Sequence, residues 1–390
     1  MVMPTGRRFD IVLFGATGFT GQLTAEYLAE HAPTGLRWAL AGRNPAKLAA
    51  VRDRLGIADL ELLTADVNDP ASLTAVAEAT RVVITTVGPY ITYGDPLVGA
   101  CAAAGTDYVD LTGEPEFVDR TYLRHHAKAV ETGARLVHCC GFDSIPYDLG
   151  VLYTVKQLPD DVPLTVDGYL TVSASISGGT FQSAVNAFSR LSDMRKAAAE
   201  RRKVEPRSVR RVRGKAHGGK VQDLGIWAVP LPTIDPQIVL RSARASDRYG
   251  TEFTYGHHLA VKRLPTALGV AGGAAGLIAA SQVRPLRNWL LSRKTSGEGP
   301  TAAQRERSWF KATFIGTGGD TRVHTELTGG DPGYTETAKM LAESALALAL
   351  DDLPPTAGQV TPATAMGDAL TTRLIAAGIT FTTISTAVRT

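Results

Sequence analysis

A glycine loop near the N-terminus limits what this chain can fold into more than any other stretch. The run Asp10–Phe14, apolar from Ile11 on, is followed by Gly15, and Gly18 and Gly21 complete the pattern G-x-x-G-x-x-G. A buried strand that enters a helix through such a turn offers unpaired N–H groups to the pyrophosphate of a dinucleotide. In this interpretation Gly15 permits the tight turn, Gly18 the approach of the phosphates, and Gly21 the packing of helix on sheet.

An ordinary strand-to-helix turn is the alternative interpretation of the same glycines. The strand before the loop and the polar helix start after it favour the binding loop, because the motif requires both. We therefore expect the cofactor to contact Gly15, Thr17, Gly18, Phe19, Thr20 and Gly21.

The end of the second predicted strand, at 36–43, distinguishes the two nicotinamide dinucleotides. NAD sites place an Asp or Glu there to hold the ribose 2′-hydroxyl. This chain has Arg43 between Gly42 and Asn44. A guanidinium at that position would pair with a 2′-phosphate, which favours NADP(H). The alternative is a surface arginine at the start of the predicted helix 45–55.

Strands and helices alternate through the first 150 residues. After the helix at 45–55 the sequence predicts strand 60–65, helix 70–79, and strands 81–87, 106–111 and 134–139. This alternation is typical of an α/β, Rossmann-type, doubly wound parallel sheet.

Ligands of such sheets bind at the carboxyl ends of the strands. Asp66 follows the third predicted strand, where the adenine is expected, although it could instead cap the next helix. Gly88 and Pro89 follow the fourth predicted strand and are expected near the nicotinamide.

A length of 390 residues exceeds one ordinary core and predicts two domains. We expect an NADP-binding Rossmann domain at 1–150, an inserted α+β substrate domain at 151–330, and C-terminal helices at 331–390 that return to the Rossmann domain. The insertion shows an alternating run at 164–176 and a predicted hairpin of strands 309–315 and 321–327. The C-terminal part shows apolar helical patterns at 333–351 and 362–377.

Composition excludes some function classes. Lys and Arg total 41 against 38 Asp and Glu, a net charge of +3, so nucleic acid is not an expected partner. Cys101, Cys139 and Cys140 form no C-x-x-C pair, and the N-terminus lacks a signal-peptide pattern, so we expect a reducing cytoplasm. Metal-ligand spacing is absent: the adjacent His125 and His126 cannot converge on one ion.

Several separated motifs together resemble the saccharopine dehydrogenase-like oxidoreductases, and more narrowly their trans-acting enoyl reductase subfamily from mycobacterial-type lipid synthesis. They are GATGFTG at 15–21, AGR at 41–43, VGPY at 87–90, YVDLTGE at 108–114, GFDSIP at 141–146, SGGT at 177–180, GDPGY at 330–334 and TPATAM at 361–366. The resemblance implies an NADPH-dependent reductase. For the subfamily it implies reduction of a carbon–carbon double bond in an acyl chain held by a polyketide synthase.

An enoyl reductase needs a proton donor beside the hydride of its cofactor. Tyr90 is the first candidate, because it follows the Gly-Pro turn. Tyr147, Asp143 and Ser144 in the loop after the sixth strand are the next candidates, as donors or orienting groups. The alternatives are that Tyr90 only lines the cofactor pocket and that Asp143 caps the helix beginning near Pro146.

Two stretches of the insertion bear on partners. The stretch 190–220 holds twelve Lys or Arg against three acids and could attract an acidic acyl carrier domain; the alternative is a solvated helix followed by a mobile loop at 206–219. The stretch 264–283 has no charge and is just long enough to span a bilayer. We interpret it as a buried or lipid-facing helix near an acyl tunnel, with peripheral contact at the inner face of the plasma membrane left open.

The expected substrate is a lipid-like acyl thioester of polyketide-derived lipid or glycolipid biosynthesis. Imine reduction of the saccharopine type is an alternative, although the charge-poor regions of the insertion argue against a substrate with three carboxylates. A non-catalytic NADP-binding protein at a lipid surface is another, since a dinucleotide fold does not guarantee catalysis. A homodimer is also left open.

Overall fold

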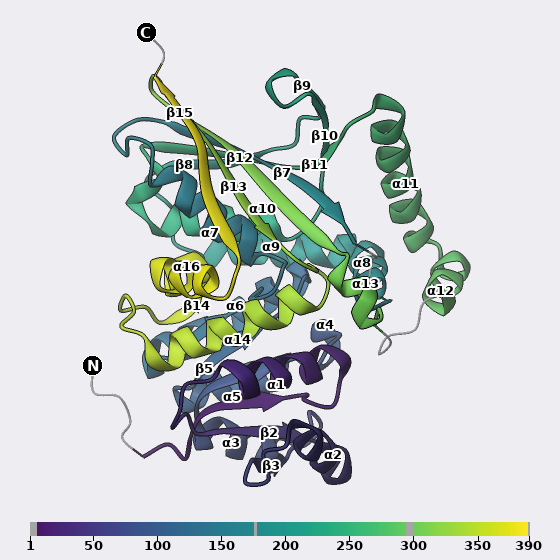
Figure 1. Ribbon diagram of the computed structural model, residues 1–390, viewed down its shortest axis with the longest axis vertical. Helices are drawn as coiled ribbons and strands as arrows, with labels where there is room; N and C mark the ends of the chain where they lie inside the picture. Colours follow the sequence, from purple (N-terminus) through teal and green to yellow (C-terminus); the bar gives the residue numbers. More distant parts are fainter. Residues whose placement is uncertain (1–5, 175–177, 294–298, 389–390) are drawn as a thin grey trace. The chain divides into compact units, whose positions relative to one another are not determined.

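The computed structural model describes residues 6–174, 178–293 and 299–388, and its internal contacts divide the chain into two units. The first unit comprises Met1–Phe142, Ala197–Val204 and Tyr334–Arg373. The second comprises Asp143–Lys196, Glu205–Gly333 and Leu374–Thr390. Each unit has its own sheet (Figure 1).

The first unit is built on a seven-stranded parallel sheet in the order β14-β6-β5-β4-β1-β2-β3. Its strands are β1 (Phe9–Phe14), β2 (Trp38–Gly42), β3 (Glu61–Thr64), β4 (Thr80–Thr85), β5 (Asp107–Asp110), β6 (Arg135–Val137) and β14 (Gly358–Val360). The chain runs outward from β1 to β3 and then returns to the other side of β1 with β4. This reversal is the doubly wound Rossmann topology, so the predicted fold class is confirmed.

Helices cover the parallel sheet because its strands are apolar on both faces. All six residues of β1 are buried. The helix α14 packs against α1 and lies on β4 and β5. The helices of this unit are α1 (Phe19–His31), α2 (Pro45–Leu55), α3 (Pro70–Ala79), α4 (Tyr90–Tyr93), α5 (Asp95–Ala104), α6 (Pro115–Thr132), α14 (Thr335–Leu350), α15 (Pro362–Ala365) and most of α16 (Gly367–Ala376).

The second unit is built on a mixed sheet in the order β15-β13-β12-β7-β11-β10-β9, with β8 paired to β11. Its strands are β7 (Leu164–Ser173), β8 (Arg211–Lys215), β9 (Gly219–Val221), β10 (Ile226–Pro230), β11 (Glu252–Val261), β12 (Trp309–Gly318), β13 (Thr321–Gly329) and β15 (Thr380–Val388). The predicted hairpin is confirmed as β12 and β13, which pair antiparallel. The predicted strand at 164–176 corresponds to β7, and residues 175 and 176 lie outside the described residues.

One face of this mixed sheet is covered by α7 (Ile145–Val155) and α10 (Asp235–Ala245), as Figure 1 shows. Gly150 allows the close contact, because a Cβ there would lie 2.4 Å from the ring of Phe314 on β12. The remaining helices are α8 (Gly178–Ser189), α11 (Leu264–Gln282), α12 (Arg284–Arg293) and α13 (Ala302–Glu306). The helix α9 (Leu191–Val204) has residues in both units.

The predicted domain boundaries need correction at two places. The first unit ends at Phe142 rather than at 150, because α7 packs on β12 and β13 of the second sheet. The C-terminal segment belongs with the Rossmann sheet only as far as Arg373. Beyond it, β15, which is rich in β-branched residues, pairs antiparallel with β13 at the edge of the second sheet.

Three local predictions also differ from the structure. The helix expected over 362–377 is two helices, α15 and α16, which are separated by Met366; α16 begins at Gly367, whose φ is +41°. The loop expected at 206–219 contains β8, which pairs in parallel with β11. The apolar helix expected at 264–283 forms as α11 and is largely exposed, with only Ala267 and Ser281 buried, so the buried interpretation is wrong and the lipid-facing one stays a prediction.

Candidate functional site

The glycine loop of the first unit has the geometry of a phosphate cradle. Gly15 has a φ of +96°, and a Cβ on it would lie 2.7 Å from Val87 Cγ2. A Cβ on Gly21 would lie 2.2 Å from the Gly15 carbonyl oxygen. A side chain at Gly21 would strike the backbone, and one at Gly15 would strike the Val87 side chain in a backbone conformation that larger residues rarely adopt, so both positions favour glycine.

The N-terminus of α1 is available to an anion. Gly18 is its N-cap and supplies no side-chain hydrogen bond, and the first turn contains no acidic residue. Gly18 thus leaves the backbone N–H groups of Thr20 and Gly21 uncapped by a side chain of its own, and the positive end of the helix dipole lies beside them. Together with the cradle, this fits a pyrophosphate, with Thr17 in the same turn.

Arg43 stands directly after β2, on the same sheet edge as the glycine loop. Its side chain is exposed, and none of the described residues forms a hydrogen bond or ion pair with it. The helix that follows is capped by Asn44, whose side-chain oxygen accepts the Lys47 N–H at 3.0 Å. Because Asn44 performs the capping, Arg43 is not needed to begin α2.

The other two predicted cofactor positions also lie at carboxyl ends of strands. Asp66 follows β3 and accepts hydrogen bonds from the backbone and side chain of Asn68, while Asp69 caps α3. The alternative that Asp66 caps this helix is therefore wrong. Gly88 and Pro89 follow β4, with Gly88 exposed.

Tyr90 has a structural partner for its hydroxyl proton. The hydroxyl donates to the Thr85 carbonyl at 3.0 Å, and the residue is only 4% exposed. Burial and the nearby charge of Asp110 raise the pKa of Tyr90 well above its usual range. The backbone N–H groups of Tyr90 and Ile91 both donate to Glu114. These contacts frame the loop after β4, and the expected role of Tyr90 as proton donor stays a prediction.

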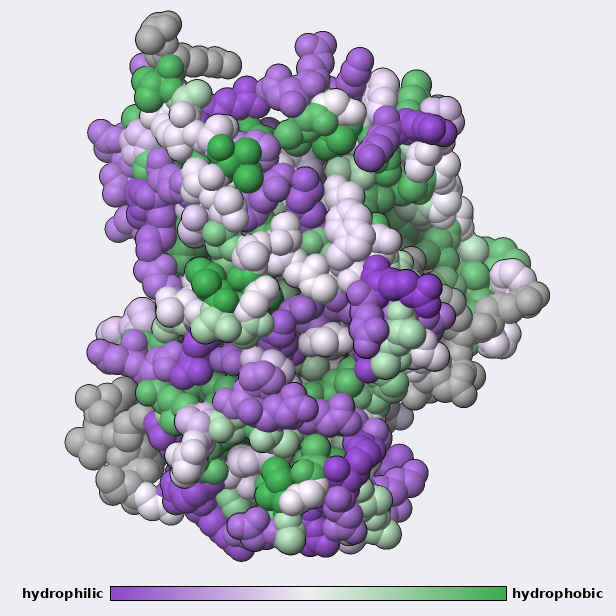
Figure 2. All heavy atoms as spheres, in the orientation of Figure 1, coloured by the Kyte–Doolittle hydropathy of each residue, from purple (hydrophilic) through white to green (hydrophobic). Residues whose placement is uncertain are grey.

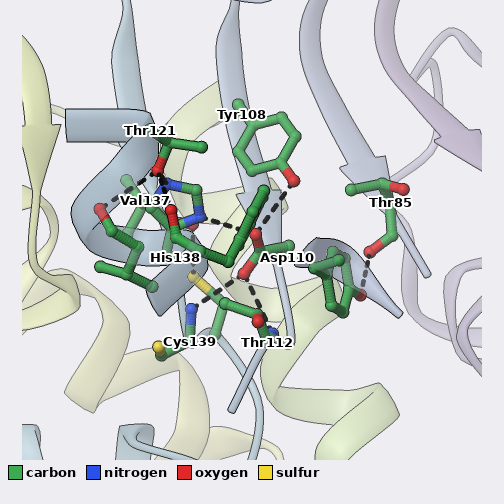
Figure 3. A network of polar contacts seen from close by, with 12 residues as sticks. Thr85, Tyr108, Asp110, Thr112, Thr121, Val137, His138 and Cys139 are labelled. Carbon is green, nitrogen blue, oxygen red and sulfur yellow. Dashed lines mark hydrogen bonds and ion pairs between the residues drawn. The ribbon is translucent and has the colours of Figure 1, made fainter. Parts of the chain in front are cut away.

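A buried network joins the ends of β5 and β6, and sequence analysis did not assign it a role. Figure 3 shows the Asp110 carboxylate at its centre. One oxygen accepts the Tyr108 hydroxyl at 2.9 Å and lies 2.6 Å from His138 Nδ1. The other accepts the backbone N–H groups of Thr112 and Cys139 at 3.1 and 3.0 Å. Four donors therefore saturate the carboxylate.

The same network fixes an uncommon backbone conformation. Cys139 has a φ of +64°, which non-glycine residues rarely adopt. Its N–H donates to the Asp110 side chain, and the next N–H, of Cys140, donates to the Asp110 carbonyl at 2.7 Å. Asp110 thereby directs the loop that carries the chain from β6 to Phe142, the last residue of this unit.

The second unit begins with a cluster of ionisable residues. Burial and the charge of the Asp235 carboxylate raise the pKa of Asp143 to about 7. Asp143 keeps partial exposure, whereas Asp235 is 1% exposed. One Asp235 oxygen accepts the Thr233 hydroxyl at 2.6 Å and lies 3.3 Å from His257 Nε2. The other has no hydrogen-bond partner among the described residues.

The remaining predicted residues border this cluster. The ring of Tyr147 packs edge-on to His257, with centroids 4.5 Å apart, and its pKa is raised by burial and by Asp235 and Asp143. The Ser144 hydroxyl is fully buried without a hydrogen-bond partner in the described part of the chain. The alternative in which Asp143 caps α7 is wrong, because Ser144 is the N-cap residue.

Sequence reasoning missed Asp235 and His257. Both lie far along the chain from Asp143, at the start of α10 and within β11, and no local spacing connects them. The only signal was the acid itself, followed by Pro236. For metal ions, no group of three His, Cys, Asp or Glu side chains that could hold one occurs within residues 6–174, 178–293 and 299–388.

Comparison with known proteins agrees with this geometry. Residues 11–137 match the saccharopine dehydrogenase NADP-binding domain. A Mycobacterium tuberculosis protein provisionally named a trans-acting enoyl reductase is 41% identical, covering 97% of this chain and 98% of its own. The trans-acting enoyl reductase of Mycobacterium ulcerans is 39% identical over 96% of this chain and 97% of its own.

This chain belongs to the trans-acting enoyl reductases of the saccharopine dehydrogenase-like family. Its cofactor is NADP(H), as the matched domain and the free Arg43 agree. The fold likeness extends to the saccharopine dehydrogenase of Saccharomyces cerevisiae, with a TM-score of 0.57 over 97% of this chain and all of that one, at 12% identity. At that identity the likeness concerns the fold alone.

Proposed function

We propose that this chain uses NADPH to reduce the carbon–carbon double bond of an α,β-unsaturated acyl thioester, presented by the carrier domain of a separate synthase. The observation that carries the proposal is the end-to-end similarity to relatives named trans-acting enoyl reductases, in a chain whose glycine cradle and Arg43 are intact. A polyketide-derived lipid or glycolipid pathway is part of the same proposal.

The reaction needs a hydride from the cofactor and a proton from a second source. Bound NADPH supplies the hydride that saturates the β-carbon of the substrate. The electron pair of the double bond then forms a C–H bond at the α-carbon with a proton that a general acid of the protein supplies. The Gly15–Gly21 cradle holds the pyrophosphate and Arg43 the 2′-phosphate.

Asp143 is the group best suited to give this proton. Its pKa near 7 keeps a substantial share of it protonated at neutral pH, whereas a Tyr90 or Tyr147 with a raised pKa releases its proton less readily. Asp143 also keeps partial exposure, so solvent can restore its proton after each turnover. It directly follows Phe142, which ends the unit that binds the cofactor.

Asp235 acts as the positioning residue for Asp143. Two neighbouring carboxyl groups share a proton more readily than they both ionise. Asp235 is held in turn by Thr233 and lies beside His257, whose Nδ1 is 3.0 Å from the Tyr255 hydroxyl. This buried chain fixes the charge that raises the pKa of Asp143.

The carrier domain is proposed to dock on α9. Five cations of the stretch 190–220 already have acidic partners: Arg190, Arg201, Arg210, Arg213 and Lys215. Arg195, Lys196, Arg202 and Lys203 on α9 are exposed and form no ion pair with the described residues. An acidic carrier would be attracted to these four in a salt-dependent manner.

An NADPH oxidation assay tests the reaction. Crotonyl thioesters of pantetheine and of an acyl carrier protein should consume NADPH and yield the butyryl product, identified by mass spectrometry. A mixture of lysine and a 2-oxo acid, the substrate pair for imine reduction, should leave NADPH unchanged. Binding of NADPH without turnover of any of these substrates would favour the non-catalytic alternative and overturn the proposal.

The docking surface is tested by charge reversal. The double variant Arg195→Glu/Lys196→Glu should lower kcat/KM for the carrier-bound substrate and leave that for the pantetheine thioester unchanged. Reversal of Lys47 and Arg52 on α2 provides the matched control. An equal loss with both substrates would show that the substitutions damage the enzyme rather than the docking of the carrier.

A further inference from the structure

The helix α11 and the following α12 form an exposed apolar surface, which we call the α11–α12 surface. Across its 19 residues α11 carries no charge, yet only 11% of its most apolar window is buried. Leu268 is 64% exposed, and Leu286 and Trp289 on α12 are 48% and 53% exposed. Figure 2 shows apolar atoms gathered along this flank of the second unit. Several large apolar side chains exposed together on neighbouring helices are typical of an interaction site.

Only one side of this surface is packed against the rest of the second unit. The helix α11 contacts α8 and β10, and α12 contacts α8. The Gln282 side-chain amide donates to the Phe188 carbonyl on α8. Along the remaining surface of α11, a Cβ on Gly269, Gly272, Gly273 or Gly276 would meet nothing within 4 Å. The helix is therefore attached to the protein but largely uncovered.

The sheet topology excludes a single membrane crossing by α11. The strand before it, β11, and the strand after it, β12, both pair with β7 in one sheet. A chain that crossed the bilayer once between them would separate two strands of the same sheet. Within the described residues α11 is the one helix long and apolar enough to cross, and α12 has ten residues with arginine at both ends.

Charge around the α11–α12 surface identifies its partner. Lys262 and Arg263 precede α11, and Arg284 and Arg287 follow it on α12. No acidic residue occurs between Glu252 and Glu298. Cations that flank an apolar helix, with a tryptophan beside them, suit the headgroup level of an anionic bilayer better than a second, equally cationic copy of this chain.

We propose that the α11–α12 surface lies in the plane of an anionic lipid bilayer and docks the protein there as a peripheral membrane protein. The apolar side chains enter the boundary between headgroups and acyl chains, and the four cations contact lipid phosphates. The proposal does not depend on the enoyl reductase activity.

Vesicle flotation with the full chain tests the proposal. The protein should float with phosphatidylglycerol–phosphatidylcholine vesicles and bind pure phosphatidylcholine vesicles at least tenfold more weakly. Leu268→Glu and Arg284→Glu/Arg287→Glu should each reduce binding to the anionic vesicles by tenfold or more. Val209→Glu, on a fully exposed apolar residue outside this surface, is the matched control and should bind like the wild type.

Two further measurements show whether a loss of vesicle binding comes from misfolding or from self-association instead. NADPH binding, followed by cofactor fluorescence, should be equal in all variants, because none of the changed residues lies in the glycine loop or at Arg43. Sedimentation velocity reports self-association. A wild type that stays unbound with anionic vesicles, or an α11-mediated dimer that Leu268→Glu dissociates, would overturn the proposal.

Discussion

The two units each bury an aspartate at the end of a strand or the start of a helix, but they satisfy its oxygens differently. Asp110 in the first unit receives four donors and is fully buried. Asp235 in the second unit has one oxygen without a hydrogen-bond partner among the described residues and a neighbouring Asp143 with a raised pKa. A saturated carboxylate holds a loop in place, whereas an unsaturated pair is available for proton transfer.

The largest expected effect is the loss of stability from removing the saturated carboxylate. Asp110→Ala leaves His138, Tyr108 and the Cys139 N–H without their acceptor and should lower the free energy of unfolding by about 3–5 kcal/mol. Urea unfolding measures this. Asp53→Ala, on the exposed side of α2, is the control. If both variants unfold at the same urea concentration, Asp110 does not hold the loop.

Replacement of the proposed donor should lower turnover without weakening cofactor binding. Asp143→Asn should reduce kcat by roughly 100-fold or more, the range of general acid catalysis, with NADPH affinity unchanged. Steady-state kinetics and cofactor titration measure the two quantities, and Asp161→Asn, on an exposed loop residue, is the control. Retention of full kcat by Asp143→Asn would remove Asp143 from the mechanism.

Removal of the Arg43 contact with the cofactor should have an effect of intermediate size. Arg43→Ala should raise the KM for NADPH roughly 10- to 100-fold, the equivalent of one charge-assisted contact, and leave that for NADH nearly unchanged. Arg52→Ala, on the helix α2 that follows Arg43, serves as the control. Equal responses to the two cofactors would contradict the role of Arg43 at the 2′-phosphate.

The pH dependence should distinguish a positioning role for Asp235 from a structural one. A donor with a pKa near 7 is active when protonated, so kcat/KM should fall as the pH rises above about 7. Asp235→Asn removes the charge that raises this pKa and should move the fall to lower pH. A lower rate with an unchanged pH profile would indicate a structural role alone.

The free energy of unfolding should also depend on the ionisation of Asp143. The folded pKa of Asp143 is raised from 3.8 to about 7, so its contribution to stability is complete below about 4 and is lost as the pH rises through 7. Asp143→Asn should flatten this part of the stability profile. Chemical denaturation at a series of pH values measures the difference.

The smallest expected effect is that of Tyr90→Phe. The variant loses one buried hydrogen bond to the Thr85 carbonyl and should be less stable by about 1 kcal/mol, with kcat close to that of the wild type. A loss of turnover similar to that of Asp143→Asn would instead support Tyr90 as the donor.

The sequence predicted the Rossmann half better than the second unit for a physical reason. The strands β1 and β4 contain short uninterrupted apolar runs, at 11–14 and 82–84, and the glycine loop and Arg43 are local signals. The edge strand β14 has three residues, too few for a pattern, and the pairing of β15 with β13 depends on neighbours distant in the sequence.

The site residues of the first unit were likewise easier to predict than those of the second. The cofactor positions could be read from residues beside their own strands. The link between Asp143, Asp235 and His257 could not, because it forms only when α10 and β11 pack beside the start of α7. Likewise, the exposure of α11 was not visible from its composition, since an uncharged helix is normally buried.

The edge strand β14 and the helix α14 also set the order in which this protein can mature. Both complete the first unit, yet they are encoded after the whole second sheet apart from β15. During synthesis the nucleotide-binding unit therefore emerges without its covering helix and edge strand. It cannot be complete until Arg373 has left the ribosome, so the cofactor-binding half, although begun first, is finished only after seven of the eight strands of the second sheet have been made.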